Sequence, residues 1–92
     1  MKLVDLVIDD NSEIIDFIQD ILSEKYSVLS APNGQKALDI IGDHTVHLVI
    51  SDIMMPVMNG LTFCQQLKSD VKYSHIPVIL LTAKKSIETK IE

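Results

Sequence analysis

Acidic residues stand directly after two apolar runs, and they are the side chains of this sequence best suited to chemistry. Residues 3–8 run into Asp9 and Asp10, and residues 48–51 run into Asp52. If both runs are neighbouring parallel strands, the three carboxylates share the crevice at the strand ends where open α/β folds bind ligands. Carboxylates about 5 Å apart repel by roughly 3 kcal/mol at an effective dielectric of about 20, and Mg²⁺ suits such an all-oxygen site. We therefore expect metal chemistry at this crevice.

Alternating strand-like and helix-like segments position these carboxylates. Strands are predicted over residues 3–8, 27–31, 48–51 and 78–81, and helices from residue 11 or 12 to about 25, from 35 to about 41 and from 61 to about 69. The order βαβαβαβ, followed by a segment of helical composition, predicts a parallel sheet with right-handed crossovers and helices on both faces. The first helix carries one apolar face, made of Ile14, Ile15, Phe17, Ile18, Ile21 and Leu22. The other two helices are expected to bury Ala37, Leu38, Ile40 and Ile41, and Leu61, Cys64 and Leu67.

The composition fits one small α/β domain and excludes several classes of protein. The chain has 92 residues, of which 47% are hydrophobic and 4% aromatic, and a formal net charge of −5. Its longest basic run is Lys84-Lys85, so direct nucleic-acid binding is not expected. The single cysteine, Cys64, excludes an internal disulfide, and no apolar stretch approaches the roughly 18 residues of a membrane span. We expect a cytoplasmic segment without a signal peptide or membrane contact.

Three motifs, in this order, resemble the receiver domain of two-component response regulators. They are the acidic pair with Asn11, Ser-Asp-Ile-Met-Met-Pro-Val-Met-Asn-Gly at residues 51–60, and Ile-Pro-Val-Ile-Leu-Leu-Thr-Ala at residues 76–83. The resemblance runs through nearly the whole chain and is strongest to receivers fused into hybrid sensor histidine kinases. It implies a flavodoxin-like, doubly wound parallel sheet of order 2-1-3-4-5. It also implies that the domain takes a phosphoryl group from a histidine kinase or phosphotransfer domain and switches conformation to control an output.

The residues of these motifs fit phosphoryl transfer to a carboxylate. A carboxylate that attacks a phosphoryl group makes an acyl phosphate, and the charge of the transferring oxygens must be neutralised by a metal and fixed donors. Asp52 is the expected phosphoacceptor, and Asp9, Asp10 and one oxygen of Asp52 are the expected Mg²⁺ ligands. The resemblance adds the backbone carbonyl of Met54 as a further ligand. Thr82, at the end of the adjacent strand, is expected to turn its hydroxyl toward a phosphoryl oxygen and to act in the switch.

Most of these residues also have a purely structural interpretation. Asp9 and Asp10 favour the N-terminus of a helix, and Asp52 or Thr82 would serve as a cap. The methionines of the second motif fit loop packing better than ligation of Mg²⁺ through sulfur. The histidines share no metal-ligand spacing and are expected at the surface or in loops, and Cys64 lies on an apolar helix stripe typical of a core residue. The combination of the acidic pair with Asp52 is what favours a functional site.

The sequence departs from the receiver pattern at its C-terminus. A complete receiver has a fifth strand that ends in Lys-Pro and a fifth helix, and no Lys-Pro occurs here. Lys84 and Lys85 follow the fourth strand, on a different element, and are not assigned the role of the phosphate-binding lysine. We expect residues 1–92 to be a single receiver domain without its C-terminal βα unit. Residues 78–81 would then form an exposed edge strand, which favours homo-oligomerisation or marginal folding.

Two alternatives come from other classes of protein. A phosphohydrolase of the haloacid dehalogenase type also uses an aspartate nucleophile with Mg²⁺, but it needs a second acid two residues later, where this chain has Met54. A phosphorylation-independent interaction module, or pseudo-receiver, fits the missing lysine and stays open. The interpretation that the residues favour is a phosphoacceptor signalling module that is not itself an enzyme.

Overall fold

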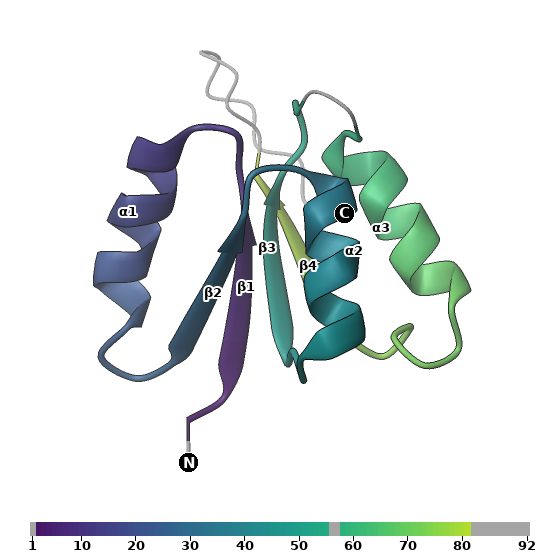
Figure 1. Cartoon of the computed structure of the whole chain (residues 1–92), viewed down its shortest axis with the longest axis horizontal. Coiled ribbons are helices and arrows are strands. Elements are labelled where there is room, and N and C mark those ends of the chain that lie inside the picture. Colours follow the sequence, from purple (N-terminus) through teal and green to yellow (C-terminus); the bar gives the residue numbers. More distant parts are fainter. Residues whose placement is uncertain (1, 56–57, 82–92) are drawn as a thin grey trace.

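The computed structural model describes residues 2–55 and 58–81. In chain order its elements are β1 (Val4–Ile8), α1 (Ser12–Leu22), β2 (Ser27–Ala31), α2 (Gly34–Asp43), β3 (Leu48–Asp52), α3 (Gly60–Ser69) and β4 (Val78–Leu81). All three strand pairs are parallel, and the order in the sheet is β2-β1-β3-β4. Figure 1 shows α1 on one side of the sheet and α2 with α3 on the other. This is the predicted flavodoxin-like architecture over the strands that the structure describes.

An asparagine precedes each of these three helices. Asn11, Asn33 and Asn59 are the N-cap residues, and their side-chain oxygens accept hydrogen bonds of 2.8–2.9 Å from backbone N–H groups two or three residues ahead. These caps place the helix starts at the predicted positions or one residue before them. α1 ends at Leu22 rather than near residue 25. The Leu22 carbonyl accepts from both the Lys25 N–H at 3.1 Å and the Tyr26 N–H at 2.9 Å, and this closing turn leads to β2.

The main core lies between the sheet and the pair of helices α2 and α3. β1 and β3 are the central strands of the described sheet, and Leu6, Ile8 and Val49 contribute to this core from them. Ala37 and Ile41 of α2 pack against the same cluster. The central strands therefore pack one face against this core, and neighbouring strands on both sides hold their carboxyl ends at fixed positions.

The core side of α3 differs from the predicted one. Phe63 and Leu67 are fully buried, whereas Leu61 is exposed and Cys64 is half-buried. The Asn59 cap begins the helix one residue earlier than predicted, at Gly60. Positions four apart lie on one side of a helix, and Phe63 with Leu67 forms that pair. The prediction that Leu61 and Cys64 are buried was therefore wrong.

The opposite face of the sheet is covered by α1 and only in part. None of the residues of α1 is fully buried. Its half-buried apolar side chains are Ile15, Ile18 and Leu22, and its exposed ones are Ile14, Phe17 and Ile21. The predicted apolar face of this helix is present, but it is wider than the area that contacts the sheet. Among the described elements, no second helix lies beside α1 on this face (Figure 1).

Candidate functional site

The three predicted acidic residues converge at the carboxyl ends of β1 and β3. These strands pair in parallel with Ile8 opposite Ser51, so Asp9 and Asp52 follow at the same edge of the sheet. Asp10 stands at the turn into α1. Each of the three residues offers one carboxylate oxygen, and these oxygens lie within 4.8 Å of one another. We call Asp9, Asp10 and Asp52 the acidic cluster.

Backbone hydrogen bonds hold Asp9 in place on both sides. Its N–H donates to the Ala31 carbonyl of β2 at 3.1 Å, and its Oδ1 accepts from the Asn11 N–H at 2.9 Å. Burial raises the pKa of the Asp9 carboxyl above its usual value, although the Asn11 N–H opposes this rise. The carboxylates of Asp52 and Asp10 raise the same pKa further. A positive charge close to Asp9 would therefore lower this pKa and favour the ionised carboxylate.

Asp52 ends β3 and is only 4% exposed. Its Oδ1 accepts from the Met54 N–H at 3.2 Å, and the Ser51 hydroxyl donates to its carbonyl at 2.9 Å. Burial raises the pKa of the Asp52 carboxyl, the Met54 and Ile53 N–H groups lower it, and the charge of Asp10 raises it. A carboxyl group that is desolvated beside like charges is typical of a functional site.

The loop after Asp52 returns closely to the end of β3. The Gly60 N–H donates to the Ile53 carbonyl at 2.9 Å. A Cβ atom on Gly60 would overlap the Asp52 carbonyl oxygen and would lie 3.0 Å from the Cα of Ile53. Any other residue at position 60 would therefore push this loop away from the strand. Pro56 of the same loop lies outside the described residues.

The predicted switch residue, Thr82, also falls outside the part of the chain that the structure describes. Its neighbour Leu81 lies opposite Asp52 in the register of β3 and β4. The Leu81 carbonyl accepts from the Ile53 N–H at 2.9 Å. The roles of Thr82 and of the Met54 carbonyl therefore stay predictions.

The donor set of the acidic cluster fits Mg²⁺. It offers three carboxylates, which are the hard oxygen ligands that this ion prefers. Repulsion from neighbouring carboxylates contributes, after burial, to the raised pKa values of Asp9 and Asp52. A small divalent cation would remove that repulsion. The acidic cluster is therefore both a candidate metal site and a candidate phosphoacceptor site.

The sequence interpretation missed a fourth carboxyl group, which lies inside the sheet. Asp5 is 1% exposed in β1, and its Oδ2 has no hydrogen-bond partner among the described residues. The signal was a lone acid within the otherwise apolar run of residues 3–8. His47, expected at the surface or in a loop, is half-buried just before β3, and its Nδ1 accepts from the Val4 N–H at 2.9 Å. Neither residue belongs to the acidic cluster.

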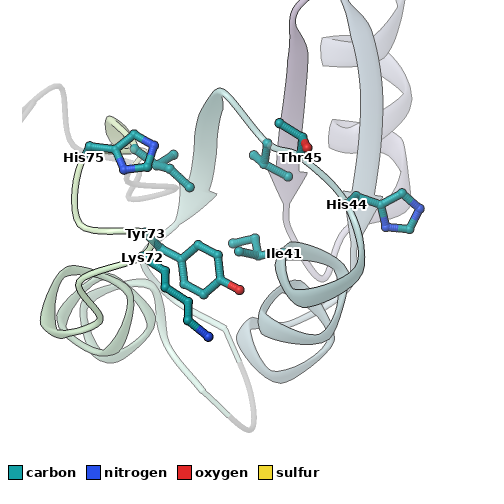
Figure 2. Close-up of a pocket in the computed structure, with 8 residues that line it drawn as sticks. Ile41, His44, Thr45, Lys72, Tyr73 and His75 are labelled. Carbon is teal, nitrogen blue, oxygen red and sulfur yellow. The ribbon is translucent and has the colours of Figure 1, made fainter.

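A separate cavity of about 180 Å³ is formed by the segments that lead into β3 and β4. It lies at the N-terminal ends of these strands, whereas the acidic cluster lies at the carboxyl ends of β1 and β3. It is lined by Ile41, His44, Thr45, Val46, Lys72, Tyr73, His75 and Ile76. Figure 2 shows Tyr73 beside Ile41, with His44 turned away from both. The Nδ1 atom of His44 lies 3.2 Å from the Ile40 carbonyl oxygen. No carboxylate lines this cavity, so it is not part of the candidate site.

Comparisons with known proteins agree with this geometry. Residues 6–92 match the family described as response regulator receiver domain. The chain is 40% identical over 87 residues to histidine kinase P4 of Formosa agariphila, an alignment that covers 95% of this chain and 6% of that protein. It is 39% identical over 88 residues to the uncharacterised transcriptional regulatory protein YrkP of Bacillus subtilis, covering 95% of this chain and 36% of that one. The solved structure of the chemotaxis response regulator CheY4 of Vibrio cholerae matches with a TM-score of 0.86 and 29% identity, covering 94% of this chain and 72% of that chain.

The fold and the acidic cluster define a signalling module of two-component systems. The chain belongs to the family of response regulator receiver domains, with relatives among both histidine kinases and regulators. It spans 6% of the length of the matched kinase and 36% of the matched regulator. No helix within residues 2–55 and 58–81 has the length and apolar character needed to cross a bilayer.

Proposed function

We propose that this receiver domain accepts a phosphoryl group on Asp52 from a phosphohistidine of a histidine kinase or phosphotransfer domain. The observation that supports this most directly is the convergence of three carboxylates within 4.8 Å at the carboxyl ends of β1 and β3. Asp52 is the member of this cluster that ends a strand and precedes the tightly closed loop. The similarity to a histidine kinase supports a donor of this kind.

The proposed reaction is an in-line transfer from nitrogen to oxygen. A carboxylate oxygen of Asp52 attacks phosphorus and forms a P–O bond, while the P–N bond breaks and the imidazole nitrogen leaves with the bonding electron pair. Asp52 must be ionised to attack, whereas its burial and the charge of Asp10 raise its pKa. Bound Mg²⁺ would supply positive charge that favours ionised carboxylates and offsets the charge of the transferring oxygens.

The metal ligands of this proposal are Asp9, Asp10, one oxygen of Asp52 and the backbone carbonyl of Met54. Asp9 and Asp52 are already oriented by backbone N–H groups, at 2.9 and 3.2 Å. Asp10 is exposed, so water has access to the cluster on that side. Mg²⁺ usually keeps several water ligands, which such a half-open site permits.

Thr82 is the proposed link between phosphorylation and output. Its predecessor Leu81 lies opposite Asp52 in the sheet, which supports a place for residue 82 near the phosphoryl group. If the Thr82 hydroxyl moves to hydrogen-bond a phosphoryl oxygen, the neighbouring loop would be repositioned. Thr82→Ala should therefore weaken the coupling between phosphorylation and output more than phosphorylation itself. Equal losses in both measurements would count against a switch role.

The proposed donor docks beside the acidic cluster on α1. This helix begins two residues after Asp10, and Ile14 and Phe17 in its first half are exposed apolar side chains. Exposed apolar residues next to a charged site mark a protein interaction surface. The negative formal charge of the chain supports a protein partner rather than nucleic acid.

We also propose that residues 1–92 are one receiver domain that lacks its C-terminal βα unit. The match to CheY4 covers 94% of this chain but 72% of that one, which supports a missing segment. Within the described sheet β4 pairs with β3 alone, and Ile79 and Leu81 are exposed. Such an edge favours self-association of the 92-residue chain through Val78–Leu81. The proposal is completed by a cytoplasmic location, no catalytic activity of its own and no membrane contact.

Beryllofluoride, a mimic of the phosphoryl group, tests the acceptor assignment. In the presence of Mg²⁺ we expect it to shift the backbone amide signals around Asp52 in wild type and to leave Asp52→Asn unchanged. Asp20→Asn removes one charge from an exposed position of α1 and should respond as wild type does. The same test is made on the wild-type chain with its natural continuation. If beryllofluoride does not shift its amide signals, the pseudo-receiver is favoured. Labelled phosphate that still reaches Asp52→Asn from a cognate kinase would contradict the assignment.

A further inference from the structure

The cavity between the segments that lead into β3 and β4 has an apolar floor and a polar rim. Ile41, Val46 and Ile76 form the floor, and each is at most 5% exposed. The half-buried Tyr73 ring forms a wall beside Ile41 (Figure 2). An apolar floor with a few polar groups around it is the usual construction of a small-molecule site. The acidic cluster lies at the other end of β3, so this cavity has no part in the proposed phosphoryl transfer.

Hydrogen bonds hold the segment that carries Tyr73 in one shape. The Tyr73 N–H donates to the Asp70 carbonyl at 3.0 Å, and the Ile76 N–H donates to the Tyr73 carbonyl at 3.0 Å. The Lys68 ammonium group of α3 donates to the Ser74 carbonyl at 3.1 Å and to the Ile76 carbonyl. The cavity wall is therefore formed in the absence of a ligand, and binding does not have to order this segment.

The rim of the cavity carries no acidic side chain within the described part of the protein. None of the 8 residues that line it is acidic, although the whole chain has 13 Asp and Glu residues against 8 Lys and Arg. Asp43 and Asp70 stand just before the two lining segments and do not line the cavity. The Asp70 carboxylate accepts from the Lys72 N–H at 2.9 Å. The rim is therefore suited to an anion, in contrast to the rest of this acidic chain.

Lys72 and His75 are the rim groups that can hold a negatively charged oxygen. A lysine offers three N–H donors on a flexible stem, and an imidazole offers at least one N–H in either charge state. Both side chains are exposed at the rim, where Thr45 adds a hydroxyl group. His44 is turned away from Tyr73 (Figure 2) and is not assigned a role.

The volume of the cavity sets the size of its ligand. The cavity measures about 180 Å³. An apolar cavity of about 150 Å³ holds a benzene molecule, so this one has room for a single six-membered ring with a small substituent. The Tyr73 ring in the wall favours an aromatic ligand, because two rings attract each other in offset-stacked or edge-to-face contact. Size and charge together indicate an aromatic ring that bears one carboxylate.

We propose that this cavity binds a small aromatic carboxylate, whose ring lies on the apolar floor and whose carboxylate pairs with Lys72 at the rim. His75 donates a further hydrogen bond to the same carboxylate. The proposal does not depend on phosphoryl acceptance. A ligand that binds only the folded state stabilises it by mass action, so binding would stabilise the domain from the end of the sheet opposite Asp52.

Amide NMR spectra of the 92-residue chain, recorded during titration with sodium benzoate, test this proposal. Benzamide serves as a neutral probe of the same size. We expect benzoate to shift the signals of residues 41–46 and 72–76 and to bind about fivefold more tightly than benzamide, the ratio that corresponds to an exposed ion pair. Thr45→Tyr places a ring at the mouth of the cavity and should remove most of the binding of both probes. Unchanged signals outside the two segments show that this variant is folded.

Two lysine variants separate the proposed ion pair from general charge. Lys72→Gln should bind benzoate and benzamide equally. Lys36→Gln removes an exposed charge of α2 outside the cavity and should keep the preference for benzoate. Equal binding of both probes by wild type, a preference that survives Lys72→Gln, or binding that Thr45→Tyr leaves unchanged would overturn the proposal. The absence of shifts in these segments at about 20 mM benzoate would do the same.

Discussion

Replacement of Asp52 by asparagine should stabilise the fold when no divalent cation is present. The substitution keeps an oxygen that can accept from the Met54 N–H, but it removes one of three charges that lie within 4.8 Å of one another. Two unit charges about 5 Å apart repel by roughly 3 kcal/mol at an effective dielectric of about 20. The neighbouring charges are among the causes that raise the pKa values of Asp9 and Asp52. We therefore expect the free energy of unfolding to rise by about 1–3 kcal/mol.

The same variant should lose most of its response to Mg²⁺. An ion that binds only the folded state stabilises it by mass action, by about 1.4 kcal/mol at ten times its dissociation constant. Thermal unfolding followed by circular dichroism, in EDTA and in millimolar MgCl₂, measures both effects. A change of 1 kcal/mol shifts the Tm of a domain of this size by roughly 4–8 °C, which is easily resolved. Asp20→Asn, which removes an exposed charge outside the cluster, should gain as much from Mg²⁺ as wild type.

Three results would refute this reasoning. If Asp52→Asn is less stable than wild type in EDTA, repulsion within the acidic cluster is not the dominant effect. If Mg²⁺ raises the Tm of wild type and Asp52→Asn equally, Asp52 is not a ligand. If Asp20→Asn stabilises the chain in EDTA as much as Asp52→Asn does, the net charge of the domain and not the cluster is responsible.

Three further predictions concern pH, the loop and the buried acid. In EDTA, the free energy of unfolding should fall as pH rises, because the pKa values of Asp9 and Asp52 are higher in the folded than in the unfolded state. Their contribution to stability is complete below pH 3.8, the unfolded value, and is lost as pH rises through the folded values. Urea midpoints that do not change with pH would contradict this. Gly60→Ala should lower the free energy of unfolding by about 1–3 kcal/mol, because the added Cβ would overlap the Asp52 carbonyl oxygen. An unchanged urea midpoint would show that the loop has room for this methyl group. Asp5→Val should stabilise the 92-residue chain by about 1–3 kcal/mol at neutral pH, because it removes a buried oxygen that has no partner among the described residues. A lower Tm of this variant would show that Asp5 has a stabilising partner within the chain.

Local patterns in the sequence determined the elements and the chemistry of the site. Apolar runs, helical periodicity and the residues before each helix predicted the alternation of strands and helices that the structure has. Asp9 and Asp52 could be assigned to one edge because parallel strands end on the same side of a sheet. The oxygen-only donor set followed from residue type alone. These inferences succeed because they depend on hydrogen bonds and periodicities within a few residues of the chain.

The tertiary structure alone decided which sides of these elements are covered. Asp5 and Leu6 are neighbours in β1, yet their side chains point to opposite faces of the sheet. Buried parallel strands are apolar on both faces, so the sequence of the strand does not tell which face meets which helix. The choice of Phe63 over Leu61 as the core residue of α3 likewise depends on how that helix meets the sheet. The raised pKa of Asp52 comes from burial among segments distant in sequence. Burial and electrostatic interactions depend on all the residues that are close in space. The sequence alone does not identify these neighbours.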